Sequence, residues 1–232
     1  MKLESIPQRY LGMWRRSLFQ QANMLDTTTL VFWIQTEQHH VDIRIPASRP
    51  IFDSTNQLED FSVEQLAFLA TQQGFTGVTK VKSNLAEWLR EFDYQPFSAQ
   101  RDIGKMHFES DSILIENGVD VDYIERWVKV PYSHLNLSMK HLVVEDRHSK
   151  KVPARLFTSN NTFAYVRPRS SQLPPAESIS AAIDYYQPSK EVLLDWLDFE
   201  ISFGEIIDKN HGGITHSTLP FREGATFKFN EL

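Results

Sequence analysis

The chain lacks several features that would point directly to a chemistry. Its 232 residues include no cysteine, so disulfide bonds, thiolate nucleophiles and cysteine-ligated zinc are excluded. Glycine is scarce, with 9 residues, and none of them forms the glycine-rich loop that cradles a phosphate or the G-x-S-x-G turn of a hydrolase. The common enzyme motifs therefore give no guide to function.

Long apolar runs and an excess of positive charge are also absent. No window approaches the ~18 apolar residues of a membrane-spanning helix, and the first residues lack the apolar run of a signal peptide. The 24 Lys and Arg residues against 30 Asp and Glu residues give a net charge of −6, which provides no electrostatic footprint for nucleic acid. We expect a cytoplasmic protein with neither a membrane span nor a nucleic-acid partner.

The 8 histidines do not form a recognisable zinc-binding motif. Adjacent His39 and His40 point to opposite faces if they lie on a strand, His211 and His216 are separated by a glycine pair, and no H-E-x-x-H motif occurs. We therefore expect no metal site and no cofactor.

The most informative stretch that is present runs from Asp26 to Pro46. β-branched and aromatic residues fill two arms on either side of a polar turn, and Pro46 ends the second arm, so the stretch predicts a long β-hairpin. Because side chains alternate along a strand, His40, Asp42 and Arg44 share one face of the second arm. One face of this hairpin is therefore charged, and the other is apolar.

Similar strand patterns recur at even spacing through the rest of the chain, and they are separated by turn signals such as Asn117-Gly118. The apolar residues within 85–95 fit either one face of a helix or one face of a strand, and we favour a strand. Helical periodicity predicts two accessory helices, near 63–73 and 176–186. We expect a mainly all-β fold, an antiparallel up-and-down barrel of about 8–10 strands, with residues 1–232 forming a single domain.

Gly12-Met13-Trp14, near the start of the first predicted strand, resembles the G-x-W signature of the lipocalins. Val121-Asp122-Tyr123 is similar to a loose version of the lipocalin T-D-Y element. The resemblance is to the calycin group, which includes lipocalins and fatty-acid-binding proteins, and it implies a barrel that closes around a small-molecule cavity. It also implies that the indole of Trp14 plugs one end and that a cation from late in the chain, for which Arg222 is our match, packs on it.

Each of the five tryptophans has a polar residue two positions away, on the same face of a strand. A wall of indoles with interleaved polar groups suits a cavity that binds a small, partly apolar ligand, such as an aromatic carboxylate. We expect the indoles to contact the ligand and Arg44, Arg90 and Glu125 to orient it. The full candidate site consists of Trp14, Trp33, Gln35, Asp42, Arg44, Trp88, Arg90, Tyr123, Glu125 and Trp127.

Two alternatives to simple binding remain open at this point. Some calycin-like barrels catalyse decarboxylation or isomerisation, and the resemblance therefore implies a cofactor-independent lyase or isomerase that uses Glu125, Tyr123 and Arg44. A structural ion pair between Arg44 and Glu125 is the simpler interpretation. The second alternative is a barrel filled by its own side chains that acts as a protein-interaction module and has no cavity of the ~300 Å³ typical of ligand sites.

Overall fold

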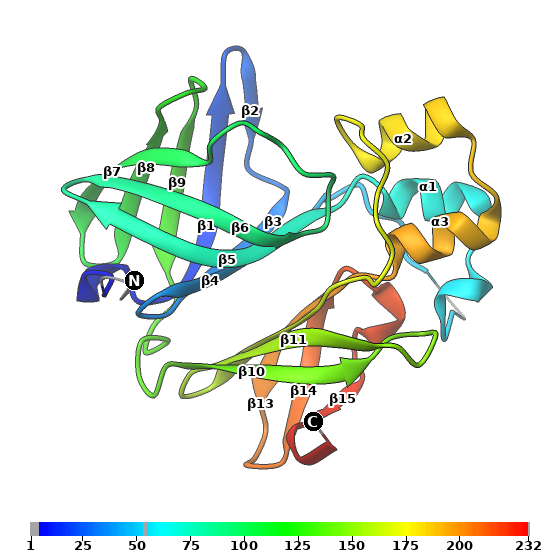
Figure 1. Ribbon diagram of the computed structural model, residues 1–232. Coiled ribbons are helices and arrows are strands. Elements are labelled where there is room, and N and C mark those ends of the chain that lie inside the picture. The colour runs from blue at the N-terminus through cyan, green and yellow to red at the C-terminus, as the bar shows by residue number, and fades with distance from the viewer. Residues whose placement is uncertain (1–4, 53–54, 232) are drawn as a thin grey trace.

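A computed structural model describes residues 5–52 and 55–231 of the chain. The first half of the chain forms a closed antiparallel barrel, and the second half contributes a separate curled sheet that lies against it (Figure 1). Three α-helices pack together beside both sheets (Figure 1). The predicted mainly-β fold with an antiparallel barrel is confirmed, and the second sheet and third helix are additions to it.

The barrel contains eight strands in a closed ring, because β1 pairs with β3 on one side and with β9 on the other. Strand β2 is short and pairs with the far end of β1. The strands are β1 (Gly12–Gln21), β2 (Met24–Asp26), β3 (Leu30–Gln35), β4 (His39–Ile45), β5 (Gln73–Lys82), β6 (Leu85–Asp93), β7 (Ile103–Ser110), β8 (Ile113–Gly118) and β9 (Ile124–Lys129).

The predicted hairpin is the pair β3–β4, in which Trp33 lies opposite Asp42. The charged face of β4 points into the barrel, whereas its apolar face, with Val41, Ile43 and Ile45, packs outward into a core shared with the second sheet and the helices. The segment 85–95 is the strand β6, as expected. Both faces of β4 are therefore covered.

The second sheet contains six antiparallel strands in chain order. The sequence analysis placed all strands in one barrel, but the pairing of β1 with β9 closes the ring and leaves no edge for a further strand. The single domain expected for residues 1–232 stays a prediction. The strands are β10 (Ser138–Glu145), β11 (Lys151–Thr158), β12 (Thr162–Arg167), β13 (Glu200–Ile206), β14 (His211–Ser217) and β15 (Thr226–Lys228).

The first two helices lie where periodicity predicted them. Helix α1 (Val63–Leu69) begins with a capping box of Ser62 and Gln65, and it ends before residue 73 because Gln73 already pairs with β4. Helix α2 spans Ile179–Tyr186. None of the helices among the described residues is long and apolar enough to cross a membrane.

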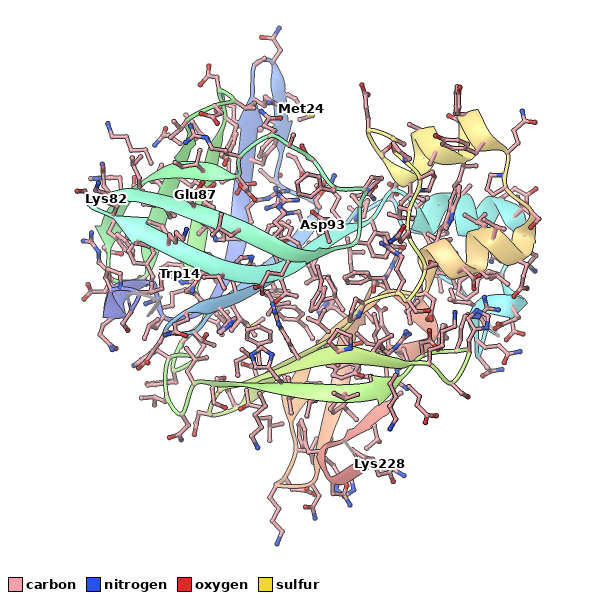
Figure 2. The ribbon with its side chains drawn as sticks, viewed as in Figure 1. Trp14, Met24, Lys82, Glu87, Asp93 and Lys228 are labelled. Atoms are coloured by element: carbon pink, nitrogen blue, oxygen red, sulfur yellow. The ribbon has the colours of Figure 1, made fainter. Side chains whose placement is uncertain are left out.

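Helix α3 (Lys190–Leu197) was missed. Ser189 caps this helix, which buries Leu193, Leu194 and Trp196 against the shared core, and the strand β13 follows it as alternation predicted. Four short 3₁₀ turns complete the inventory: η1 (Gln8–Tyr10), η2 (Leu58–Asp60), η3 (Pro220–Arg222) and η4 (Phe229–Glu231). Side chains fill the space inside the barrel and the space between the two sheets (Figure 2). In this view Trp14 on β1 and Glu87 on β6 are labelled on the barrel.

Candidate functional site

Four of the five tryptophans lie together inside the barrel. The ring centroid of Trp33 is 6.1 Å from that of Trp14, 5.7 Å from that of Trp88 and 5.6 Å from that of Trp127. The structure therefore brings together the four indoles that spacing had placed on inward faces. They pack on one another, so this part of the interior is filled rather than hollow.

Trp14 closes the end of the barrel near the N-terminus. Its indole N–H donates to the carbonyl of Tyr10 at 2.7 Å, and Gly12 has a φ of 120°, with Ser133 so near that a Cβ on Gly12 would lie 2.9 Å from its Oγ. The cation on the indole is Lys129, whose Nζ lies 4.5 Å from the ring centroid. The expectation that Arg222 packs on the indole of Trp14 was wrong.

Arg222 instead lies at the second sheet, where its Nε donates to Glu200 at 3.1 Å. Order along the chain suggested Arg222 because its segment comes near the C-terminus. The C-terminal segment belongs to a sheet outside the barrel, so the cation near Trp14 comes from the last barrel strand.

Two arginines and two carboxyl groups form a buried network on the inner face of the barrel. Arg16 donates to Glu125 at 2.8 Å, Arg44 Nε donates to Asp42 at 2.9 Å, and Arg44 Nη1 lies 3.7 Å from Glu125. Burial raises the pKa values of Asp42 and Glu125, and the neighbouring guanidinium groups oppose this rise. Arg44 and Glu125 thus meet as expected, but Arg16 is the closer partner of Glu125.

Glu116 is a buried carboxyl group that the sequence analysis did not select. Tyr123 donates its hydroxyl to Glu116 Oε1 at 2.6 Å, and Trp127 donates its indole N–H to Oε2 at 3.1 Å. Burial, reinforced by the charge of Glu125, raises the pKa of Glu116 well above its ordinary range. The carboxyl partner of Tyr123 is therefore Glu116 rather than Glu125.

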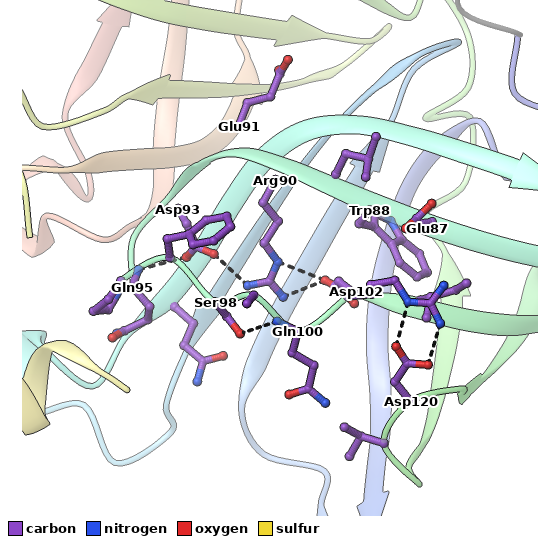
Figure 3. A pocket seen from close by; sticks show the side chains of 18 of the residues that line it. Glu87, Trp88, Arg90, Glu91, Asp93, Gln95, Ser98, Gln100, Asp102 and Asp120 are labelled. Carbon is purple, nitrogen blue, oxygen red and sulfur yellow. Dashed lines mark hydrogen bonds and ion pairs between the residues drawn. The ribbon is translucent and has the colours of Figure 1, made fainter. Parts of the chain in front are cut away.

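Arg90 lies at the open end of the barrel, between β6 and the loop that precedes β7 (Figure 3). Its guanidinium group pairs with Asp102 at 2.6 Å and with Asp93 at 2.8 Å, and its central carbon lies 3.7 Å from the ring centroid of Phe75. Asp102 also escaped the sequence analysis, because a loop residue carries no periodic signal. Arg90 is held in place by both carboxylates.

Gln35 belongs to a different buried network. Its amide donates to the carbonyl of Thr36 at 2.9 Å and accepts from Thr79 at 2.7 Å, and Thr79 also contacts His40 Nδ1 at 3.0 Å. Burial lowers the pKa of His40 well below its ordinary range, which favours the neutral ring. Gln35 and its neighbours therefore link β3, β4 and β5 on the inner face.

The open end of the barrel carries a groove of about 930 Å³. Strands β6 and β7 pair from Leu85 to Glu87 on the β6 side, and the N–H of Trp88 donates to the carbonyl of Asp102 at 2.9 Å. The wall splits beyond Trp88, and the groove occupies this split together with the 95–102 loop. Trp88, Arg90 and Tyr123 line the groove. Three of the ten expected site residues therefore face it.

A much smaller cavity of about 10 Å³ lies deeper in the barrel. It has room for roughly one water-sized group. Its lining consists of Trp33, Asp42, Arg44, Phe75, Trp88, Asp102, Glu116 and Trp127. Trp88 and Asp102 line both the cavity and the groove, so the two spaces adjoin there. Trp14, Gln35 and Glu125 line neither of them.

One further group of possible metal ligands occurs in the described ranges, formed by His148, Glu191 and Asp195. Arg147 donates to Asp195 at 2.7 Å and to Glu191 at 3.1 Å. A guanidinium group thus already supplies the positive charge at this cluster, which argues against a cation there.

Comparison with known proteins yields structural likeness only: no family model and no curated protein matches the chain. An uncharacterized protein, YLR301w from Saccharomyces cerevisiae, has a TM-score of 0.51 and 12% identity, over 89% of this chain and 84% of that chain. This likeness covers both sheets, and it speaks for the fold alone.

Two shorter structures from Bacteroides are also similar. A lipocalin-like protein from Bacteroides uniformis has a TM-score of 0.35 and 12% identity, over 53% of this chain and 99% of that chain. An uncharacterized protein from Bacteroides eggerthii has a TM-score of 0.34 and 10% identity, over 52% and 99%. The closed antiparallel barrel itself is the fold that the calycin resemblance implies.

Proposed function

We propose that this protein binds a small, partly apolar ligand in the groove at the open end of its barrel. The observation that carries this proposal is the split between β6 and β7, which opens a space of about 930 Å³ beside an indole, a phenol and a fixed guanidinium group. Ligand sites generally combine a concave apolar surface with a few polar groups that fix orientation. The groove offers both.

The residues have different roles in this proposal. Trp88, Arg90 and Tyr123 contact the ligand, since they line the groove. Trp14, Trp33 and Trp127 form the packed floor beneath it. The ligand therefore occupies the mouth, not the length of the barrel, because the interior cavity measures only about 10 Å³.

Native mass spectrometry of the protein purified from its own source tests the proposal. We expect an extra mass that is reproducible and that disappears when the chain is denatured. A Ser98→Trp variant places an indole in the groove, and we expect it to remove the extra mass. Ser112→Trp is the matched control, because Ser112 is an exposed serine in the turn between β7 and β8 and does not line the groove.

A bare chain mass in the wild-type sample, together with no change on Ser98→Trp, would count against ligand binding. That result would favour the filled barrel that acts as an interaction module, and the packed indoles agree with such a barrel. An extra mass that persists equally in both variants would place the ligand elsewhere.

A second candidate function is proton transfer to or from a substrate in the same groove. The hydrogen bond between Tyr123, which lines the groove, and the buried carboxyl of Glu116 favours it, since burial keeps this carboxyl available as an acid. Glu116 then takes the role that the sequence analysis gave to Glu125. Glu116→Gln should abolish turnover while it changes binding of a neutral substrate by less than about tenfold, or 1.4 kcal/mol. Retained turnover would eliminate this candidate.

A further inference from the structure

We propose that the ligand of the groove is a small primary amine, whose ammonium group enters the cavity beside Glu116 while its apolar part lies in the groove against Trp88. This inference rests on the proposed function and adds the chemical class of the ligand. It follows from the charge balance, the aromatic walls and the size of the cavity.

The open half of the barrel interior contains more carboxyl groups than guanidinium groups. The guanidinium groups belong to Arg16, Arg44 and Arg90. The carboxyl groups belong to Asp26, Asp42, Asp93, Asp102, Glu116 and Glu125. Each of these three guanidinium groups already pairs with at least one of these carboxylates, so an anionic group that enters the cavity would have to displace one of them. Arg169 lines the groove but not the cavity, and it donates to the carbonyls of Asp93 and Tyr94. A cation that enters the cavity meets no such competitor.

Glu116 is the one member of this set without an ion-pair partner within 4.0 Å among the described residues. Its side chain is almost sealed, with 3% of the residue exposed, and its two partners, Tyr123 and Trp127, are neutral donors. A buried carboxyl group without a cation keeps its proton, and an ammonium group in the adjoining cavity lets it ionise, so that the proton leaves to solvent and a buried ion pair forms. Asp42 and Asp102 lie in the same wall and add further acceptors.

Aromatic rings form the rest of the cavity wall. Trp33, Trp88 and Trp127 line it, and the indole N–H of Trp33 is buried without a hydrogen-bond partner among the described residues. Aromatic faces attract cations, most strongly when the cation is desolvated. Arg44 also lines the cavity, but Asp42 and Glu125 already offset its charge.

The size of the cavity selects among cations. A volume of about 10 Å³ accepts one water-sized group. An –NH₃⁺ group is of this size, whereas a trimethylammonium group is several times larger. The body of the ligand reaches the groove past Trp88 and Asp102, the two residues that line both spaces.

Calorimetric titration with three indole probes of one shape tests the class of ligand. The probes are tryptamine, its neutral analogue 3-ethylindole and its acidic analogue indole-3-propionate. We expect tryptamine to bind at least about tenfold more tightly than either analogue at neutral pH. N,N,N-trimethyltryptammonium should lose this advantage because its head exceeds the cavity.

Variants of two glutamates locate the ammonium group. Glu116→Gln keeps the size of the side chain and removes its charge, so we expect tryptamine affinity to fall at least about tenfold while 3-ethylindole affinity is unchanged. Glu109→Gln is the matched control, because Glu109 is an exposed carboxylate on β7 that lines neither the groove nor the cavity. It should change tryptamine affinity by less than about twofold.

The outcomes separate this inference from the proposed function. Equal or tighter binding of 3-ethylindole or indole-3-propionate, abolished by Ser98→Trp, would overturn the amine and leave the groove as a ligand site. Equal loss of tryptamine affinity in Glu109→Gln and Glu116→Gln would overturn the placement beside Glu116. If no probe binds at millimolar concentration, the amine inference is overturned, and the mass of the bound molecule alone then decides the proposed function.

Discussion

Replacement of Glu116 by glutamine should change how the stability of the protein depends on pH. The pKa of this carboxyl lies well above its ordinary range in the folded state, first because of burial and second because of Glu125. In the unfolded chain it returns to about 4.3. Between these two pKa values the folded protein holds a proton that the unfolded chain has released.

The sign of the effect follows from this proton. Stability from Glu116 is fully present below the unfolded pKa, and it is lost as the pH rises through the interval up to the folded pKa. The loss is about 1.4 kcal/mol for each pH unit in that interval. The total loss therefore grows with the width of the interval between the two pKa values.

Glutamine at position 116 carries no titratable proton, and it can satisfy both partners. Its carbonyl accepts from Trp127, and its amide donates to the hydroxyl of Tyr123, which can rotate to accept. We expect the variant and the wild type to have similar free energies of unfolding below the unfolded pKa, and the variant to gain about 1.4 kcal/mol for each pH unit above it, up to the folded pKa. Urea titrations followed by the fluorescence of the buried indoles provide the measurement.

Parallel stability curves for the wild type and Glu116→Gln would refute the reasoning. Glu125→Gln is not a suitable control, because it removes one of the two carboxylates that pair with Arg16, the other being that of Asp26. Glu87→Gln is suitable, since this half-exposed side chain lies outside the cavity, and its curve should run parallel to that of the wild type.

Three further substitutions probe the barrel and the first helix. Arg16→Met leaves the buried carboxylate of Glu125 with a weaker counter-ion, and chemical denaturation should show a loss of about 3–5 kcal/mol. Gly12→Ala forces a φ of 120° on a residue with a Cβ, and the melting temperature should fall by an amount equivalent to about 1–3 kcal/mol. Ser62→Ala removes the cap of α1, and denaturation should show a smaller loss of about 1 kcal/mol. A loss from Ser62→Ala larger than that from Arg16→Met would contradict the weight given to the buried network.

The sequence specified the strands well, because alternation and turn signals are local. The β3–β4 hairpin, the β5–β6 hairpin and the cap of α1 all appear where their residues indicate them. The partition into two sheets was not accessible, since the β1–β9 pairing that closes the barrel joins residues more than a hundred positions apart. Helix α3 was missed because it spans only Lys190–Leu197, which is too short for a clear helical period.

The site was predictable to the extent that spacing on strands determines which side chains share a face. Arg16, Arg90 and Glu125 each lie two positions from an inward tryptophan, and all three face inward with it. Glu116 could have been found by the same argument, because it lies two positions after the buried Leu114 on β8. Asp102 could not, since its position depends on the course of the 95–102 loop.

The charged face of β4 points into the barrel for a reason that cannot be read from the sequence of one strand. Apolar faces normally point into a barrel, and the face of β4 with Val41, Ile43 and Ile45 would be expected to do so. In this protein the second sheet and the helices cover the outside of β3 to β5, and that apolar face packs into the core they share. The charged face is left to line the interior, so Asp42 and Arg44 must be paired, and the indoles must fill the space around them. The polar interior near the groove is therefore a consequence of the second sheet, and a barrel without that sheet would have no reason to place its carboxylates beside its tryptophans.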